Sequence, residues 1–307
     1  MKKYILILVC FACFFTVRVY SQNYLEYYKK INDAEINNLN GNYAKSDSLY
    51  HIAFTLVKKP FKEDYFLAAK NSEKLGDCQT TYNHLQLSLK NGLSFKRIKT
   101  KDFRNFKEST FWRKLKAEKK QLEETYLSNI NVSLRDEIRE MIKQDQKARR
   151  PIFGSWKQTK KTDYYNYNRL LKIIEENNNK WPGFSIIGEN TPKGKYDVTD
   201  NISLMLLHFK RKQIKTLKPY ILDAVLKGEM YPYHFARIID YKYFGDAIKI
   251  TKESSGKIKI NTCNKYGTYL NTKICDCKKA EIEREKIGFE PLKDYYRKRK
   301  SKFKCLK

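Results

Sequence analysis

The order of apolar and polar positions predicts helices along most of this chain. In the first half, apolar and aromatic residues recur every three or four positions, which is the spacing of one face of a helix. Short segments that contain glycine, proline or asparagine interrupt these runs. The helices that we expect in this half cover residues 24–39, 46–57, 64–75 and 79–89.

These four predicted helices form two similar pairs, which are offset by 35 residues. Gly41-Asn42-Tyr43 aligns with Gly76-Asp77-Cys78, and Ala34 aligns with Ala69 at the same offset. The small residues allow paired helices to approach closely, and the turn glycines allow the backbone to reverse. The pattern resembles the tetratricopeptide repeat, whose period is about 34 residues.

A repeat of this kind buries its apolar face only against a neighbouring repeat. We therefore expect the aromatic-rich segment 95–115 to form shorter helices that cap the stack, with 116–126 as a helical connector. Residues 22–126 are assigned to this tetratricopeptide-like helical repeat domain. The resemblance implies a concave surface for a protein or peptide partner. The alternative is a scaffold that only positions the next domain.

The second half is predicted to be an α-rich domain, residues 127–307, that contains one small β-hairpin. A helix ends near residue 149, and we expect a loop from there to Tyr164. The later helices are expected at residues 164–176, 202–209, 217–226, 232–239 and 279–286. Alternating residues at 247–251 and 257–262 predict the hairpin. The predicted fold class is therefore mainly α.

Several short motifs in this half resemble an uncharacterised bacterial domain family of unknown function. The likeness covers roughly residues 134–296. It rests on Asp145-Gln146-x-x-Arg149, Trp181-Pro182 with Gly188, His208, Ala236-x-x-x-Asp240, Tyr266-Gly267-Thr268, Glu283-Arg284 with Gly288-Phe289-x-Pro291-Leu292, and Tyr295. Because the family has no known reaction, the resemblance implies a domain boundary and no mechanism.

The chain departs from the family pattern at three places. Tyr241 stands where the family usually has arginine, Phe209 where it often has a second histidine, and Tyr269 where it usually has glutamine. If those polar residues carry chemistry in the family, this chain is an altered or inactive member.

Four polar residues are the candidates for catalysis. Asp145, Arg149, His208 and Asp240 each lie at the end of a helix-like segment, so a polar pocket forms if those ends converge. A histidine with a carboxylate is an acid–base pair at neutral pH, and an arginine holds an anionic substrate group. The alternative is that Asp145 and Arg149 form an i,i+4 salt bridge and that His208 is a hydrogen-bonded core residue.

No established cofactor-binding or catalytic motif is present in the sequence. The P-loop, the G-x-G-x-x-G pattern, the G-x-S-x-G elbow and H-E-x-x-H are all missing. We therefore expect no cofactor. His51 and His84 are isolated in the sequence, and we expect them at the surface or at the edge of the core.

The start of the chain has the pattern of a secretory signal peptide. Lys2-Lys3 precede an apolar run at residues 4–17, and a small residue, Ser21, precedes the expected cleavage site. The run is shorter than the roughly 20 apolar residues of a membrane span. We expect residues 1–21 to be removed and the mature protein to be periplasmic or secreted, without a transmembrane span. An uncleaved N-terminal anchor is the alternative.

Five cysteines remain after the predicted cleavage, and an odd number cannot all pair within one chain. We expect a disulfide between Cys263 and either Cys275 or Cys277, with free thiols as the alternative. Cys275-Asp276-Cys277 has no second cysteine pair and no histidine nearby to complete a zinc site. The sequence therefore predicts no metal site. The five cysteines are Cys78, Cys263, Cys275, Cys277 and Cys305.

The formal net charge is +29, and it is distributed along the chain. Such an excess favours an anionic surface as a partner, or it reflects solvated lysine-rich faces. No nucleic-acid module is present, and export also argues against nucleic acid. The first hypothesis is an exported protein-interaction or scaffold module of the cell envelope. The alternatives are an envelope hydrolase that uses the His/Asp site, and a basic binder of an anionic polymer or a membrane surface.

Overall fold

The computed structural model describes residues 23–150, 155–189, 202–244, 249–252, 258–261 and 263–306. The described part of the chain is mainly helical, as the periodicity predicts. The predicted signal peptide lies outside the described residues. Among the helices of the described ranges, none is long and apolar enough to cross a membrane.

Four helices open the described chain, close to where the hydrophobic pattern predicts them. Their starts differ from the prediction by at most three residues and their ends by at most one. They are the helix of residues 23–39, α2 (Tyr43–Leu56), α3 (Lys62–Lys74) and α4 (Cys78–Lys90). Gly41 and Gly76 precede α2 and α4 with φ angles of 80° and 75°. This left-handed backbone is strained for residues with a Cβ atom, so both turns depend on glycine.

The segment after α4 differs from the predicted third unit of short helices. Two 3₁₀ turns and one short helix lead into a single long helix that absorbs the predicted connector. These elements are η1 (Phe95–Arg97), η2 (Thr100–Asp102), α5 (Arg104–Glu108) and α6 (Thr110–Ser128). Phe103, Phe106 and Leu115 are fully buried against α3 and α4, so the aromatic residues do cap the preceding helices.

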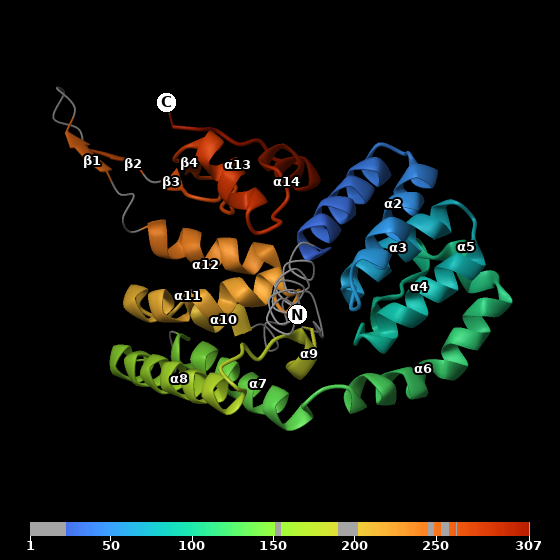
Figure 1. Ribbon diagram of the computed structural model, residues 1–307, viewed down its shortest axis with the longest axis horizontal. Helices are drawn as coiled ribbons and strands as arrows, with labels where there is room; N and C mark the ends of the chain where they lie inside the picture. Colours follow the sequence, from blue (N-terminus) through green and yellow to red (C-terminus); the bar gives the residue numbers. More distant parts are fainter. Residues whose placement is uncertain are drawn as a thin grey trace, which may run out of the picture.

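The C-terminal half stacks its helices in layers (Figure 1). The layer of α7 and α8 packs on α10 and α11, and α12 covers these in turn. The helices are α7 (Val132–Ala148), α8 (Trp156–Glu176), α9 (Phe184–Ile187), α10 (Ile202–Leu206), α11 (Arg211–Leu226) and α12 (Pro232–Phe244). One apolar core runs through all the layers, with Leu170, Leu217 and Ile221 fully buried.

The loop predicted up to Tyr164 is wrong for residues 156–163, because α8 begins at Trp156. Ser155 caps its first turn, with the Ser155 hydroxyl accepting the Gln158 N–H at 3.1 Å. This hydrogen bond satisfies one of the free N–H groups at a helix start. The cap explains why the polar residues after Ser155 are helical without a clear apolar stripe.

Two pairs of strands follow α12. β1 (Lys249–Lys252) and β2 (Ile258–Asn261) pair antiparallel where the hairpin is predicted, with Ile250 opposite Ile260. β3 (Cys263–Asn264) and β4 (Lys273–Ile274) form a short parallel pair that the sequence pattern does not predict. α13 (Cys277–Glu285) and α14 (Leu292–Lys298) complete the chain.

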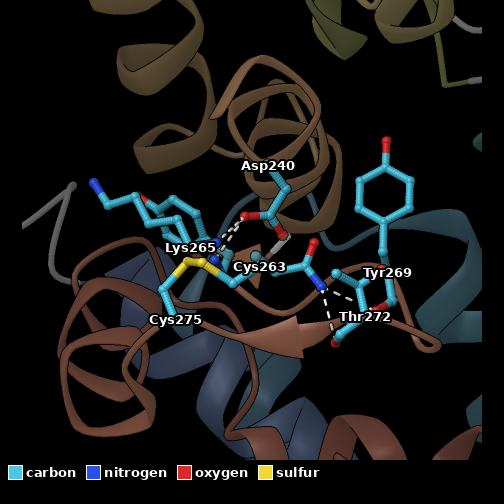
Figure 2. Close-up of a disulfide and its surroundings, with 8 residues drawn as sticks. Asp240, Cys263, Lys265, Tyr269, Thr272 and Cys275 are labelled. Carbon is cyan, nitrogen blue, oxygen red and sulfur yellow. Dashed lines mark hydrogen bonds between the residues drawn. A yellow bond between two sulfur atoms is a disulfide. The ribbon is translucent and has the colours of Figure 1, made fainter. Parts of the chain in front are cut away.

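Two disulfides join these C-terminal segments. Cys263 is bonded to Cys275, one of the two partners considered from the sequence, and Figure 2 shows this bond beside the loop of residues 264–272. Cys277 is bonded instead to Cys305, a pairing that the sequence analysis did not consider. Cys78 is free. The last residues are therefore covalently held to the start of α13.

The helix of residues 23–39 packs against the C-terminal half. The Tyr28 hydroxyl donates to the Val225 carbonyl at 2.8 Å, and the Asn32 amide donates to Asp294 at 2.7 Å. Gly288 has a φ of 67°, and a Cβ atom there would lie 2.3 Å from the Tyr28 ring. The close approach of this helix thus requires a glycine on the facing loop.

We predict that the Cys277→Ser/Cys305→Ser double variant loses about 3 to 4 kcal/mol of unfolding free energy, because the bond closes a loop of 28 residues in the unfolded chain. Urea unfolding of the oxidised wild type and of the variant measures the difference. Cys78→Ala is the control, for which we expect a loss of no more than about 1 kcal/mol. Equal losses in the two proteins would contradict the prediction.

Candidate functional site

The structure brings three of the four predicted catalytic residues together. His208 lies in the turn between α10 and α11, and its Nδ1 is 2.9 Å from Oδ2 and 3.0 Å from Oδ1 of Asp145 in the last turn of α7. Arg149, at the end of the same helix, donates from Nη1 to Asp145 Oδ1 at 2.7 Å. Asp145 is fully buried, whereas the His208 side chain is 19% exposed.

This geometry fixes the histidine. A carboxylate accepts hydrogen bonds only, so Nδ1 of His208 carries the proton in this pair and Nε2 is the basic nitrogen. A buried carboxylate behind an imidazole holds the ring in one tautomer and orientation, as in the Ser-His-Asp arrangement. The i,i+4 salt bridge predicted as the alternative is also present, so Asp145 serves both His208 and Arg149.

Two further residues that the sequence analysis did not select extend this cluster. Asp163 of α8 accepts from Arg149 Nη2 at 2.5 Å. Lys242 of α12 donates from Nζ to the Leu207 carbonyl at 2.6 Å, next to His208. The pKa of Lys242 is lowered to about 8, mainly by burial; Asp163 opposes this effect, and Arg149 and Arg211 add to it. The cluster therefore joins α7, α8, the turn between α10 and α11, and α12 around the His208 imidazole and the Lys242 amine.

Asp240, the fourth predicted catalytic residue, has a different role. Its carboxylate accepts from the backbone N–H groups of Lys265, Tyr266 and Thr268 at 2.7 to 2.8 Å and from the Thr268 hydroxyl at 2.7 Å. Figure 2 shows Asp240 above this loop, beside the Cys263–Cys275 disulfide. Asp240 thus anchors the loop, and the convergence of all four predicted residues on one pocket is not found.

Other motif residues of the C-terminal half support the same loop. Arg284 is fully buried, donates to the carbonyls of Tyr266 and Glu290, and lies 3.7 Å from the ring centroid of Phe289. The Tyr295 hydroxyl donates to the Thr268 carbonyl at 3.0 Å. These contacts make Arg284 and Tyr295 determinants of the fold.

Phe209, Tyr241 and Tyr269, which the sequence analysis singles out, have separate surroundings. Phe209 is fully buried and packs edge-on against Tyr167, with ring centroids 5.6 Å apart. Tyr241 is 47% exposed. Tyr269 is half-buried and near Arg237, whose hydrogen bond lowers the pKa of the tyrosine against the larger raising effect of burial. Phe209 therefore provides an apolar wall directly after His208, where a second histidine would be desolvated.

A separate hollow lies between the N-terminal helices and the C-terminal end of the chain. It consists of two adjoining depressions of about 590 and 530 Å³, which share Glu35, Leu67 and Lys298. We call the two together the groove. One depression lies over the helix of residues 23–39, α2, α3 and α5, and the other reaches Tyr231–His234 and Gly288–Glu290. No single sequence motif indicates it, because its walls come from both halves of the chain.

Buried ionisable groups line the groove and its floor. Burial raises the pKa of Asp64 well above its usual value, and the nearby Glu35, Glu189 and Glu63 raise it further, although a hydrogen bond from the Tyr27 hydroxyl lowers it. Lys298 bridges Glu35 and Glu290. Desolvated groups of this kind in a hollow are typical of functional sites. The groove is therefore a second candidate site beside the His208 cluster.

Comparison of the chain with protein-family models, curated proteins and solved structures finds no match. The functional argument therefore rests on the geometry of these two sites.

We predict that Asp64→Asn changes how stability depends on pH. Because its pKa is raised in the folded state, Asp64 contributes stability that is complete below about pH 4 and is lost as the pH rises through its folded pKa. The asparagine variant should therefore gain relative to the wild type with rising pH, by up to about 1.4 kcal/mol per unit while Asp64 titrates. Urea unfolding from pH 4 to 8 measures this difference.

The exposed Asp223 provides the matched control, since Asp223→Asn removes a carboxylate paired with Lys227 on the surface of α11. A stability difference between Asp64→Asn and the wild type that stays constant across this pH range would exclude a raised pKa at Asp64.

Proposed function

We propose that this protein is an exported interaction module that holds a segment of a partner polypeptide in the groove. The observation that carries the proposal is that the two depressions share Glu35, Leu67 and Lys298 in their linings and so lie side by side between distant parts of the chain. Channels of several hundred Å³ with a few polar groups in an apolar lining are the usual form of a binding site.

The lining suits a polypeptide ligand. Tyr28, Phe61, Tyr233 and Phe289 supply aromatic surface, which is enriched where proteins bind one another. Acidic and basic side chains alternate around them, and these give hydrogen-bond partners to a backbone and to charged side chains. An extended segment with apolar and charged residues matches these walls better than a single anionic polymer does.

The location of the groove also agrees with the tetratricopeptide-like repeat that we propose for the N-terminal half. α2 and α4 begin 35 residues apart, and each follows a glycine in the left-handed conformation. Helical repeats bind partners along the concave surface that their stacking creates. We propose that the helix of residues 23–39 and α3 form such a surface here, and that the C-terminal half closes its open side.

Export is part of the proposal. It is supported by the signal-peptide pattern of residues 1–21 and by the two disulfides, since disulfides persist in oxidising compartments. We propose a periplasmic or secreted location and a partner that is itself part of the cell envelope.

Photo-cross-linking tests the proposal. A photoreactive phenylalanine analogue in place of Leu39, at the rim of the groove, should give discrete protein adducts in the native host after illumination. The same analogue in place of Ile282 on α13 is the control, because the two side chains are equally exposed, at 54% and 55%, and Ile282 is not part of the groove lining. Adducts from both positions, or from neither, would count against the groove.

The His208 cluster favours a second candidate function, an envelope hydrolase. In it, His208 would act as the general base through Nε2, Asp145 would orient the ring, and Arg149 would hold an anionic substrate group. The contact of His208 with a fully buried carboxylate supports this alternative. Asp240 is hydrogen-bonded to the loop of residues 265–268 instead. It is therefore not part of this proposed catalytic site.

A panel of chromogenic esters, phosphate esters, glycosides and peptides tests the second candidate. If one of them is hydrolysed, we expect His208→Gln to lower kcat by about 10²- to 10⁴-fold, the usual contribution of a general base. Thr216→Ala, an exposed change on α11, should leave the rate unchanged. A rate that is insensitive to His208→Gln would show that the activity arises elsewhere.

A further inference from the structure

Three potential metal ligands meet on the N-terminal half, away from the groove lining and the His208 cluster. Asp47 and His51 lie one turn apart on α2, and His84 lies on α4. One ligand atom of each side chain lies within 4.8 Å of the other two. His51 Nε2 and Asp47 Oδ2 are 3.4 Å apart, and the two imidazole centroids are 5.7 Å apart.

The surroundings of His84 are unusual for a histidine. The residue is only 4% exposed, and neither of its ring nitrogens has a hydrogen-bond partner among the described residues. Phe54 and Tyr65 pack around the ring, with centroids 5.6 and 6.3 Å away. Burying a polar group without a partner is costly. A ligand shared with Asp47 and His51 would satisfy one of these nitrogens.

We propose that Asp47, His51 and His84 bind a divalent transition-metal ion, Zn²⁺ by the chemistry of the set. Two imidazoles and one carboxylate are typical zinc ligands, whereas Mg²⁺ and Ca²⁺ take oxygen ligands. Three protein ligands leave the fourth position of a tetrahedral ion open, as in catalytic zinc sites. The His51 side chain is 60% exposed, so this position is accessible from solvent.

The spacing of the ligand atoms fits this assignment. Zinc–nitrogen and zinc–oxygen bonds of about 2.0–2.1 Å place two tetrahedral ligands roughly 3.3 Å apart. Asp47 and His51 already have this separation, at 3.4 Å. His84 offers a ligand atom within 4.8 Å of the other two, so binding would require shifts of the Asp47 and His51 side chains toward it. The Ser72 hydroxyl lies 3.3 Å from Asp47 Oδ1 and 3.1 Å from the Ala68 carbonyl, so its one proton is available to either acceptor.

The ion would connect two helices that belong to different helical pairs of the N-terminal half. Because the site exists only when α2 and α4 are packed, binding energy is added to folding energy. We therefore expect Zn²⁺ to raise the Tm of the protein, and the increase to grow with the concentration of free Zn²⁺.

Isothermal titration of the mature chain, made without a polyhistidine tag, with ZnCl₂ tests the site. We expect one ion per chain. His51→Asn and Asp47→Asn should each weaken binding by at least about 100-fold, because even the loss of an outer-shell partner costs 10- to 100-fold. Both side chains are on the surface side of α2, so the variants should keep the far-ultraviolet circular dichroism of the wild type.

Asp223→Asn is the matched control, since Asp223 and Lys227 form an exposed i,i+4 pair on α11 as Asp47 and His51 do on α2. It should leave Zn²⁺ affinity unchanged. His84→Phe, which fits the aromatic surroundings, should abolish binding and the Zn²⁺-dependent rise in Tm together. The proposal is overturned if the wild type shows no saturable binding of Zn²⁺, or if His51→Asn and Asp47→Asn bind it as tightly as the wild type does.

Discussion

The packing of Phe61 between the two halves of the chain is the contact on which the arrangement of the molecule depends. On one side its ring meets Tyr27 and Tyr28, and on the other it lies 4.6 Å from the ring centroid of Tyr231. Aromatic pairs of this kind contribute both buried area and a preferred orientation. Because Phe61 directly precedes α3, this contact helps to set the position of α3 relative to the C-terminal half, and Phe61 is itself part of the groove lining.

The same region contains carboxylates whose burial is unfavourable. Glu189 accepts the backbone N–H of Lys62 at 2.8 Å and the Tyr231 hydroxyl at 2.5 Å, yet burial still raises its pKa. Asp64 likewise accepts a hydrogen bond from the Tyr27 hydroxyl, and burial raises its pKa as well. Such groups reduce stability at neutral pH. Raised carboxylate pKa values beside a hollow are found both in functional sites and in structural ion-pair networks.

The motif residues of the C-terminal half divide into two groups by their contacts. Asp240, Arg284 and Tyr295 hold the loop of residues 265–268 through its backbone groups. The hydrogen-bonding groups of these three side chains therefore stabilise the fold. Asp145 and His208 form a pair in which Nε2 of the imidazole is left as the base. The motif residues therefore include both fold determinants and a potential reactive pair, and the contacts of each residue separate the two.

The sequence by itself determined the helices and the place of the hairpin, because helical periodicity and glycine turns are local properties. It also correctly placed Asp145 beside Arg149, since an i,i+4 pair on one helix needs no tertiary information. The contact of Asp145 with His208 was a hypothesis, and only the packing of α7 against α10 brings these side chains together. The start of α8 was missed because a single cap, Ser155, outweighs the weak apolar pattern after it.

Only the tertiary structure decided the remaining features, since each depends on residues far apart in the chain. The Cys277–Cys305 bond and the parallel pairing of β3 with β4 follow from how the C-terminal segment folds back. His84 was expected at the surface or the core edge, and it is buried because rings from α2 and α3, those of His51, Phe54 and Tyr65, pack around it. The groove has walls from both halves of the chain, so no local pattern predicts it. Local periodicity sets the helices, and long-range packing sets which polar side chains meet.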